Sequence, residues 1–233
     1  MREIIFDTET TGLDPRSGHR LVEIGCVELI DRRESGRTFH AYFHPERDMP
    51  AEAEAVHGLS IQFLSDKPLF AERADELLVF LGDAPMVAHN AAFDFGFVNA
   101  ELERAGRPPV DMARMCCTVQ MARKLHPGAK HSLDALCTRY GIDRSHRVKH
   151  GALLDAELLA HLYIEMTGGR QIGLGLAAGT NISGRTTVIL PGTATAPSRP
   201  FREPRPHAAT PAELARHAEF VATLHQPLWH DSP

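Results

Sequence analysis

The chain has 233 residues and a mass of 25.7 kDa, which fits one medium-sized domain with an appendage or two small domains. Hydrophobic residues make up 43% and charged residues 24%, so the composition excludes a chain that is disordered throughout. No apolar run reaches the roughly 18 residues of a membrane-spanning helix, and no secretory signal opens the chain, so we expect a cytoplasmic protein without a membrane partner. The net charge of −5 argues against a protein that coats long nucleic acids. It does not exclude an enzyme that holds only a nucleic-acid end through metal ions.

The order of apolar patterns along the chain predicts strands first and a mixture of helices and strands afterwards. Apolar residues at helical spacing, bounded by capping residues or glycine, predict the helices, and short apolar runs predict the strands. The sequence therefore predicts an α/β domain with a mixed sheet. In chain order we expect a strand beginning at 4–6, a strand over 21–30, a turn over 31–36, a strand over 37–44, a helix over 70–81, a short strand over 86–88 and helices around 95–105, 133–140 and 154–166.

The composition changes sharply after the last of these helices. Residues 170–206 are rich in glycine and proline and lack sustained periodicity, so we expect a flexible linker there. In the following segment, 207–233, Thr210, Pro211 and Glu213 form a capping box with proline at the first helical position. Apolar residues at helical spacing follow and form a stripe on one side of the expected helix. A single short helix is only marginally stable in water. The stripe therefore needs a partner, either the protein's own core or another protein; it consists of Leu214, Ala218, Val221 and Leu224, and Trp229 follows it.

Two carboxylates follow the first expected strand. Asp7 and Glu9 are two residues apart, so on an extended strand their side chains point to the same face. Neighbouring carboxylates beside a buried strand repel each other and lose hydration, a cost that divalent cations commonly offset. Asp94 lies where a short strand passes into a helix, and there it could cap the helix instead. A solvated strand edge and a helix cap are the structural alternatives.

A histidine and a further aspartate form the third piece of the pattern. His150 and Asp155 are five residues apart, which on one continuous helix is about 140° out of phase. They converge more easily if His150 lies on a loop and Gly151 separates it from the helix that carries Asp155. The alternative is a solvated histidine and an aspartate on a helix surface.

Together these pieces are the parts of a two-metal phosphodiester hydrolase. Four carboxylates at strand and helix ends provide the hard oxygen ligands that hold two Mg²⁺ or Mn²⁺ ions about 4 Å apart. A neutral histidine nearby can accept a proton from water, because imidazole titrates near neutral pH.

Several segments spread over residues 4–169 also match one known family. The three acidic motifs, in this order and at about this spacing, resemble the motifs of the DEDD exonucleases that carry a histidine in the third motif. Within that family the resemblance is to the epsilon-type proofreading subunits of bacterial DNA polymerase III. The segments that carry it are FDTETTG, LVEIGCVEL, VHGL, HNAAFDFGF, ARKLHPGAKHSLDALCTRYGID and HGALLDAELLAHLYIEMTGG.

The resemblance implies a ribonuclease H-like exonuclease domain over residues 1–169, with a mixed central sheet flanked by helices. It implies an enzyme that removes mismatched nucleotides from the 3′ end of a DNA primer. The metal ligands would be Asp7, Glu9, Asp94 and Asp155, with Asp7 bridging both ions, and His150 would be the general base.

The resemblance also implies which residues contact the substrate. Asp7, Glu9 and Asp155 correspond to positions that meet the terminal nucleotide. Glu52 and His57, in the segment EAEAVHG, correspond to two more. The alternative for this second pair is a surface glutamate and a loop histidine.

The tail matches the parts of the family that bind other replication proteins. Gln171, Leu174 and Leu176 resemble the peptide that binds the sliding clamp, although they could belong to an ordinary linker. Residues 207–230 correspond to the segment that docks on the polymerase (alpha) subunit, through Leu214, Val221, Leu224 and Trp229. The sequence leaves open whether a small accessory subunit also binds.

Two other functions fit parts of the pattern. A free-standing 3′–5′ exonuclease acting on RNA or short oligonucleotides would carry nearly the same motifs, but it would not need a polymerase tether. A non-catalytic factor that bridges clamp and polymerase would need the tail but not the four acids and His150. Phe93 is left out of the expected site, because it could pack in the core as well as near a nucleotide.

Overall fold

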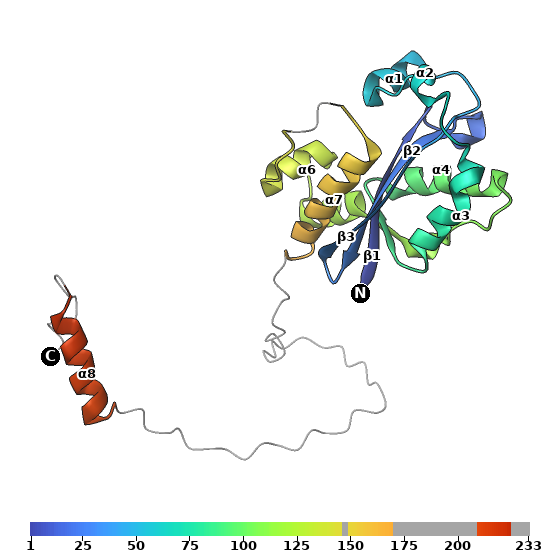
Figure 1. The fold of residues 1–233 in the computed structure, drawn as a ribbon. Coiled ribbons are helices and arrows are strands. Elements are labelled where there is room, and N and C mark those ends of the chain that lie inside the picture. The colour runs from blue at the N-terminus through green and yellow to red at the C-terminus, as the bar shows by residue number, and fades with distance from the viewer. Residues whose placement is uncertain (146–148, 170–208, 225–233) are drawn as a thin grey trace, which may run out of the picture. The chain divides into compact units, whose positions relative to one another are not determined.

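The computed structural model describes residues 1–145, 149–169 and 209–224 (Figure 1). These residues belong to two units, one within Met1–Ala178 and the other within Gly179–Pro233, and each unit is described by itself. The described elements of the first unit are β1 (Arg2–Thr10), the 3₁₀ turn η1 (Pro15–Ser17), β2 (Leu21–Ile30), β3 (Arg33–Tyr42), α1 (Ala51–His57), α2 (Ile61–Leu64), α3 (Phe70–Leu81), β4 (Met86–Ala88), α4 (Ala91–Arg104), the 3₁₀ turn η2 (Met112–Arg114), β5 (Met115–Cys117), α5 (Thr118–Leu125), α6 (Leu133–Tyr140) and α7 (Ala152–Met166).

Five strands form one mixed sheet in the order β3-β2-β1-β4-β5. β1 pairs antiparallel with β2, and β2 pairs antiparallel with β3. On its other edge β1 pairs parallel with β4, which pairs parallel with β5. This arrangement confirms the expected α/β fold with a mixed sheet, and it places β1 at the centre with helices on both faces.

The alternation of side chains along β1 divides the core into two clusters. Ile4 and Phe6 pack on one face, against apolar side chains of α3 and α4. Ile5 points to the opposite face and packs with apolar side chains of α5, α6 and α7. Figure 1 shows α3 and α4 on one side of the sheet and α6 and α7 on the other. A strand buried on both faces needs apolar residues at successive positions, as the run Ile4-Ile5-Phe6 provides.

Several helix ends are those that the sequence predicted. α3 ends at Gly82, as expected. The Ser132 hydroxyl caps α6 by accepting a hydrogen bond from the Ala135 N–H at 3.3 Å. Gly141 then ends α6 in the left-handed conformation, with a φ of 68° that glycine adopts without steric cost.

The connection between β2 and β3 differs from the expected one. The predicted turn over 31–36 and strand over 37–44 are wrong in their bounds, because β3 begins at Arg33. Asp31 and Arg32 form the whole turn, with positive φ values of 49° and 61°. Positive φ at both central residues is the geometry of the tight turns that match the twist of a hairpin. The polar run that suggested a long turn is instead the exposed start of an edge strand.

Four short elements were not expected from the sequence. They are α1, α2, β5 and α5, of which the longest, α5, has eight residues. The other three have at most seven residues, too few turns for a periodic apolar pattern to stand out. α5 is as long as α6, but it has neither the side-chain cap nor the terminal glycine that mark the ends of α6.

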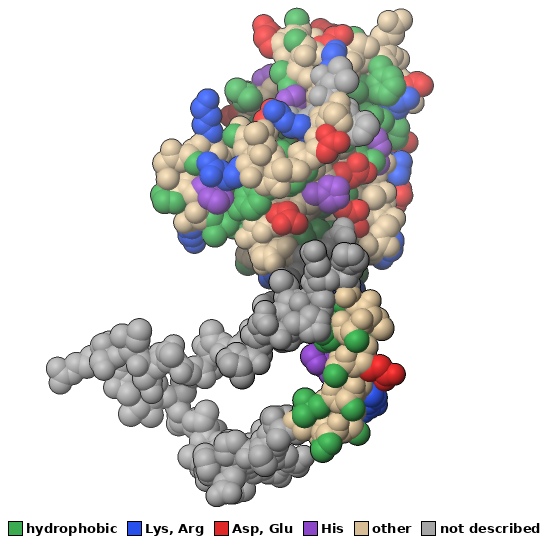
Figure 2. All heavy atoms as spheres, turned by 90° about the vertical axis from the view of Figure 1, so that its left-hand side faces the viewer, with side chains coloured by type: hydrophobic (Ala, Val, Ile, Leu, Met, Phe, Trp, Pro, Cys, Tyr) green, Lys and Arg blue, Asp and Glu red, His purple; other side chains and the backbone are tan. Residues whose placement is uncertain are grey.

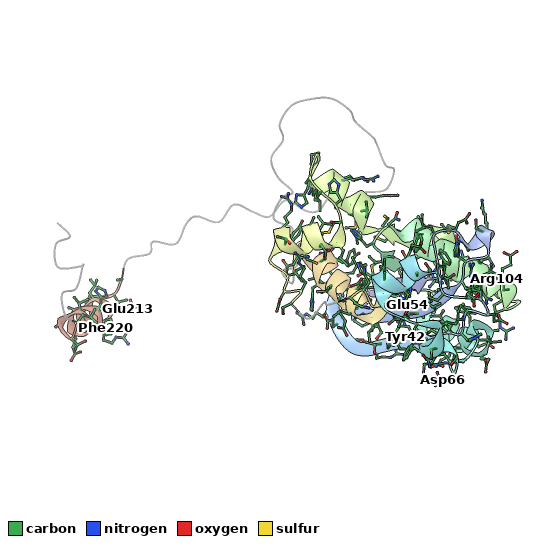
Figure 3. All side chains as sticks on the ribbon, turned by 90° about the horizontal axis from the view of Figure 1, so that it is seen from above. Tyr42, Glu54, Asp66, Arg104, Glu213 and Phe220 are labelled. Atoms are coloured by element: carbon green, nitrogen blue, oxygen red, sulfur yellow. The ribbon has the colours of Figure 1, made fainter. Side chains whose placement is uncertain are left out.

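The described part of the second unit is one helix, α8 (Pro211–Ala222). Thr210 and Glu213 make the predicted capping box: the Thr210 hydroxyl accepts from the Glu213 N–H at 3.3 Å, and the Glu213 carboxylate accepts from the Thr210 N–H at 2.8 Å. Figure 3 labels Glu213 and Phe220 on this helix. Leu214 is exposed and Val221 is buried. The expected linker, 170–206, lies outside the described residues.

The surface carries charges of both signs. On the face that Figure 2 shows, acidic, basic and histidine side chains are interspersed with apolar ones. Among the residues that the structure describes, no helix combines the length and apolar character needed to span a bilayer.

Candidate active site

The carboxylates of the first motif lie at the end of the central strand. In the β1–β2 ladder Asp7 lies opposite Gly25, and Glu9 lies opposite Glu23. Both carboxylates project toward the face covered by α7, as their two-residue spacing predicted. Glu9 is buried, with 8% of its surface exposed.

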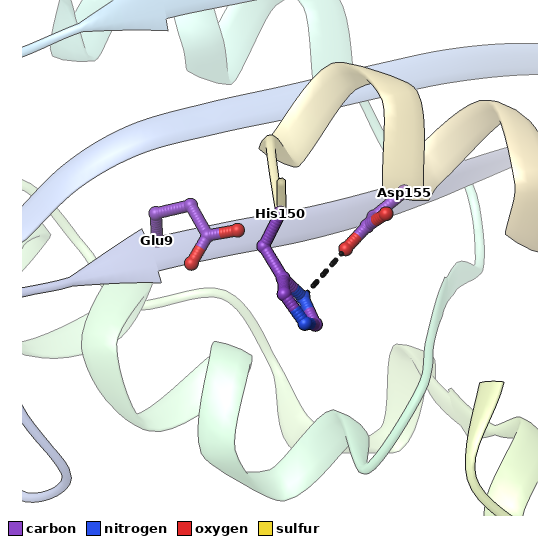
Figure 4. A group of neighbouring side chains, drawn as sticks. All are labelled: Glu9, His150 and Asp155. Carbon is purple, nitrogen blue, oxygen red and sulfur yellow. Dashed lines mark hydrogen bonds and ion pairs between the residues drawn. The ribbon is translucent and has the colours of Figure 1, made fainter. Parts of the chain in front are cut away.

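The third motif brings a loop histidine against a helix aspartate. Gly151 is the N-cap of α7 and is extended, with φ of −160°, so His150 lies just outside the helix and Asp155 lies in its first turn. The His150 Nδ1 and Asp155 Oδ2 atoms are 3.1 Å apart (Figure 4). Asp155 is buried, and its place at the helix N-terminus favours a negative charge. The expected break at Gly151 is the reason that the two side chains meet.

The two motifs converge at one point. Glu9, His150 and Asp155 each have one possible ligand atom, and these three atoms lie within 4.8 Å of one another. In Figure 4 the Glu9 carboxylate points toward His150. Two carboxylates and an imidazole, two of the three side chains buried, are a donor set suited to a divalent cation. The residues present therefore fit the metal ions that the sequence pattern requires.

Asp94 approaches the same strand from the opposite face of the sheet. The N-cap of α4 is Asn90, so Asp94 does not cap the helix but lies in its first turn. The Thr8 hydroxyl donates a hydrogen bond of 2.7 Å to Asp94 Oδ1, and both side chains are buried. Burial raises the pKa of Asp94 to about 7, although the Thr8 hydroxyl opposes the shift. Asp94 thus meets β1 at the residue between Asp7 and Glu9.

Asp7 and Asp94 are not members of the group within 4.8 Å. Asp7 lies two residues before Glu9 on the same face of β1, and Asp94 lies against Thr8. The four acids and the histidine therefore gather around the end of a single strand. Of these five, Glu9, His150 and Asp155 have ligand atoms close enough to bind one metal ion together.

A cleft of about 590 Å³ adjoins this cluster. Glu9 lines it, and so do Glu52 and His57 from α1. The His57 Nδ1 atom accepts a hydrogen bond of 3.0 Å from the Leu59 N–H, which places the ring proton on Nε2. Burial lowers the pKa of His57, so the ring is neutral at pH 7. Figure 3 labels Glu54 on the same short helix. The structure thus brings both expected substrate residues to the space beside Glu9.

Two residues of this region were not in the predicted site. Phe93 lines the same cleft, and its ring also packs on Phe97 with centroids 5.0 Å apart, so it faces both the core and the cleft. Thr8 fixes the Asp94 carboxylate. Its position between two candidate metal ligands was the signal in the sequence that could have identified it.

The expected partner-binding residues are only partly within the described structure. Leu214, Val221 and Leu224 lie on α8 or just after it. Gln171, Leu174, Leu176 and Trp229 lie outside the described residues.

Comparison with known proteins agrees with this geometry. Residues 4–163 match the family model described as "Exonuclease". The chain is 44% identical over 231 residues to the DNA polymerase III subunit epsilon of Rickettsia felis, which covers 96% of this chain and 97% of the relative. It is 47% identical over 176 residues to the subunit of the same name from Escherichia coli, covering 72% of each chain.

Solved structures of exonucleases share the fold. Exonuclease X in complex with 5′ overhanging duplex DNA matches with a TM-score of 0.55 and 27% identity, over 71% of this chain and 90% of that one. The zinc-bound complex of E. coli exonuclease I with single-stranded DNA matches with a TM-score of 0.61, over 71% of this chain and 40% of that one. Its identity of 17% supports likeness of fold alone.

The family model spans most of the chain, and the Rickettsia relative aligns along nearly its whole length. Both agree with the resemblance that the acidic motifs indicated. The chain therefore belongs to the exonuclease family, among the epsilon subunits of DNA polymerase III, and its activity is that of a proofreading exonuclease.

Proposed function

We propose that this chain removes mismatched nucleotides from the 3′ end of a DNA primer by hydrolysing the terminal phosphodiester bond. The observation that carries the proposal is the convergence of Glu9, His150 and Asp155 within 4.8 Å, beside a cleft of about 590 Å³. A cleft of this size fits a nucleotide. The acids and the histidine would then lie at the phosphate of the nucleotide that occupies it.

The four acids Asp7, Glu9, Asp94 and Asp155 would hold two divalent metal ions, Mg²⁺ or Mn²⁺. Carboxylate oxygens are the ligands that these ions prefer, and the gathering of buried carboxylates around β1 is costly without them. When bound, such ions lower the pKa of a water molecule and stabilise negative charge on the phosphate and the leaving oxygen.

His150 would act as the general base. If its Nδ1–H donates to the Asp155 carboxylate, at the observed 3.1 Å, the lone pair lies on Nε2 and can take a proton from the attacking water. The water oxygen forms a bond to phosphorus as the bond from phosphorus to the 3′-oxygen breaks. The proton taken from water is returned to that 3′-oxygen. The products are a nucleoside 5′-monophosphate and a strand shortened by one residue that ends in a 3′-hydroxyl.

The residues of the cleft would hold the terminal nucleotide. Glu52 offers an acceptor for a sugar hydroxyl, and His57 lies buried beside it on α1. Phe93 offers an aromatic surface in the same cleft.

The tail would attach this exonuclease to the replication machinery. Residues 207–233 would dock on the polymerase subunit, and Gln171, Leu174 and Leu176 would bind the sliding clamp across a linker over 170–206. The exposed apolar side chains of α8, Leu214 and Phe220 among them, support docking on another protein. Tethering would raise the local concentration of the exonuclease at the primer end, which suits a chain of acidic net charge. This role belongs to the bacterial cytoplasm, where the replicative polymerase works.

The first experiment is degradation of a single-stranded DNA oligonucleotide labelled at its 5′ end. The purified chain is incubated with Mg²⁺, with Mn²⁺ and with EDTA, beside the Asp7→Ala and His150→Ala variants and a parallel RNA substrate. We expect a metal-dependent ladder that shortens from the 3′ end, runs faster on DNA and disappears in both variants. A His150→Ala variant as fast as the wild type would contradict the role of the base.

A pull-down tests the proposed tether. Deletion of residues 207–233 should abolish binding to the polymerase subunit, whereas substitution of Gln171 and Leu174 should abolish only binding to the clamp. Polymerase binding that survives the deletion would refute the docking role of the tail.

A further inference from the structure

Gly25 lies at an unusually close contact between the sheet and α7. It lies in β2 directly opposite Asp7. A Cβ atom at residue 25 would come within 2.2 Å of the backbone nitrogen and 2.3 Å of the Cα of Leu153, and within 2.4 Å of the carbonyl carbon of Ala152. Real Cβ atoms essentially never approach other heavy atoms below 3.0 Å. The backbone of the first helical turn therefore rests directly on the backbone of the strand.

This contact lies between the two halves of the candidate site. On the strand side, the residue paired with Gly25 is the candidate ligand Asp7. On the helix side, Leu153 is two residues before Asp155, and Ala152 is two residues after His150. Any displacement of the first turn of α7 away from β2 moves Asp155 and His150 away from Glu9 together.

Residue 25 must be glycine because there is no space for a side chain between β2 and α7. The atoms that a Cβ would meet belong to the backbone, so no change of side-chain rotamer can relieve the overlap. Two other glycines provide a contrast: a Cβ at Gly96, inside α4, or at Gly151, beside the site, would meet nothing within 4 Å.

We propose that Gly25 is a positioning residue, which sets the distance between the first turn of α7 and β1 and so brings Asp155 and His150 within reach of Glu9. This inference rests on the proposed function of those three residues. The nearest backbone atom would lie 2.2 Å from a methyl group at residue 25, and ordinary contact begins at 3.4 Å, so the helix must move back by more than 1 Å. Metal sites for Mg²⁺ require nearly ideal ligand placement, and a misplacement of about 1 Å can reduce a rate by roughly 100-fold.

The experiment compares Gly25→Ala in the full chain with two controls. Gly96→Ala makes the same chemical change where there is room for it. Leu162→Ala removes a fully buried side chain from the far half of α7, so it loosens the fold without pushing the first turn off the sheet. For each variant we measure kcat and KM on single-stranded DNA, Mn²⁺ affinity by calorimetry, and the thermal midpoint, at a temperature where circular dichroism shows the variant to be folded.

We expect Gly25→Ala to lose about 100-fold in kcat and about tenfold in Mn²⁺ affinity, with KM nearly unchanged, because α1 and α4, and not α7, supply the helix residues of the cleft. Gly96→Ala should keep the wild-type kcat, KM and Mn²⁺ affinity, and its thermal midpoint should be equal or higher, because alanine favours a helix interior over glycine by about 0.5–1 kcal/mol. Leu162→Ala should lower the thermal midpoint but keep its kcat and Mn²⁺ affinity. Loss of kcat in Leu162→Ala equal to that in Gly25→Ala would assign the effect to stability and overturn the proposal.

Two outcomes separate this proposal from the proposed function. If the wild type degrades DNA and Gly25→Ala keeps its kcat and Mn²⁺ affinity, the positioning role is refuted while the function stands. If the wild type itself does not degrade DNA, the proposed function is refuted, and the positioning role that rests on it is refuted as well. If Gly25→Ala does not fold, a crystal structure of the wild type decides: an alanine Cβ built at residue 25 that clears the α7 backbone by more than 3.4 Å would refute the contact.

Discussion

Replacing Asp94 with asparagine should make the metal-free protein more stable while it removes metal binding. Asp94 is buried, and burial raises its pKa from 3.8 to about 7, so the folded protein holds this carboxylate in its ionised form only at a cost. Asparagine has nearly the same shape and keeps an oxygen that accepts the hydrogen bond from the Thr8 hydroxyl. The substitution therefore removes the buried charge and keeps an acceptor for the Thr8 hydroxyl.

The size and the pH dependence follow from the pKa shift. An aspartate whose pKa is raised on folding favours the folded state below its unfolded pKa, and that advantage is lost as the pH rises through the folded pKa. The relevant window is therefore about pH 4 to 7. A shift of about three pKa units at 1.36 kcal/mol per unit corresponds to about 4 kcal/mol above pH 7. In a domain of this size that is a difference of roughly 10 °C in the thermal midpoint.

The assay is urea unfolding of the wild type and Asp94→Asn in EDTA between pH 4 and 8, repeated with saturating Mn²⁺. In EDTA the two proteins should be equally stable at pH 4, and the variant should be more stable at pH 8. With Mn²⁺ at about 100 times its Kd, the wild type should gain about 2.7 kcal/mol, whereas the variant should gain much less. Equal stability of the two proteins at pH 8 in EDTA would refute the claim that the buried carboxylate is costly.

Three further predictions concern polar contacts in and beside this sheet. The Ser35 hydroxyl, together with Arg2 and Arg37, holds the pKa of Glu28 below its usual range. Glu28→Gln should therefore lose stability above about pH 4.5 and match the wild type as acid protonates Glu28, which thermal midpoints measured against pH will show. Arg20 makes two hydrogen bonds to the buried carboxylate of Glu101, at 2.7 and 2.9 Å, so Arg20→Met should cost about 3 kcal/mol in urea unfolding. The double variant with Glu101→Met should recover most of that loss, and a double variant as unstable as Arg20→Met would contradict the charge argument. Thr8→Val removes the hydrogen bond to Asp94 and should weaken Mn²⁺ binding about tenfold by calorimetry, whereas unchanged affinity would mean that the hydroxyl does not place the carboxylate.

The parts of the fold that the sequence predicted are those with long or sharply bounded patterns. The helices α3, α6 and α7 each carry apolar residues at helical spacing with a capping residue or a glycine at an end. The hairpin between β2 and β3 was mispredicted because its turn uses Asp31 and Arg32 at positive φ, without the glycine that usually marks such turns. Its strand start is exposed and polar, so composition alone resembled a loop.

The candidate site was predictable where its geometry is local. The alternation of a strand places Asp7 and Glu9 on one face, and the break at Gly151 lets His150 turn back to Asp155. The contacts that the sequence did not indicate join residues far apart in the chain. The bond from Thr8 to Asp94 spans 86 residues, and such a contact leaves no periodic trace in the sequence.

The side chains of β1 alternate between the two faces of the sheet, and this alternation limits how the chain can change in evolution. Asp7 and Glu9 point to the face of the sheet that α7 covers. Thr8, the residue between them, points to the other face and contacts α4. A one-residue insertion or deletion before Asp7 within the strand would slip its register and exchange these faces, which would turn both carboxylates away from His150. A single substitution in the strand, by contrast, does not change which face each of the other side chains points to. The number of residues in β1 is therefore under as strict a constraint as their identity, and length variation among related chains should fall in the loops beyond it.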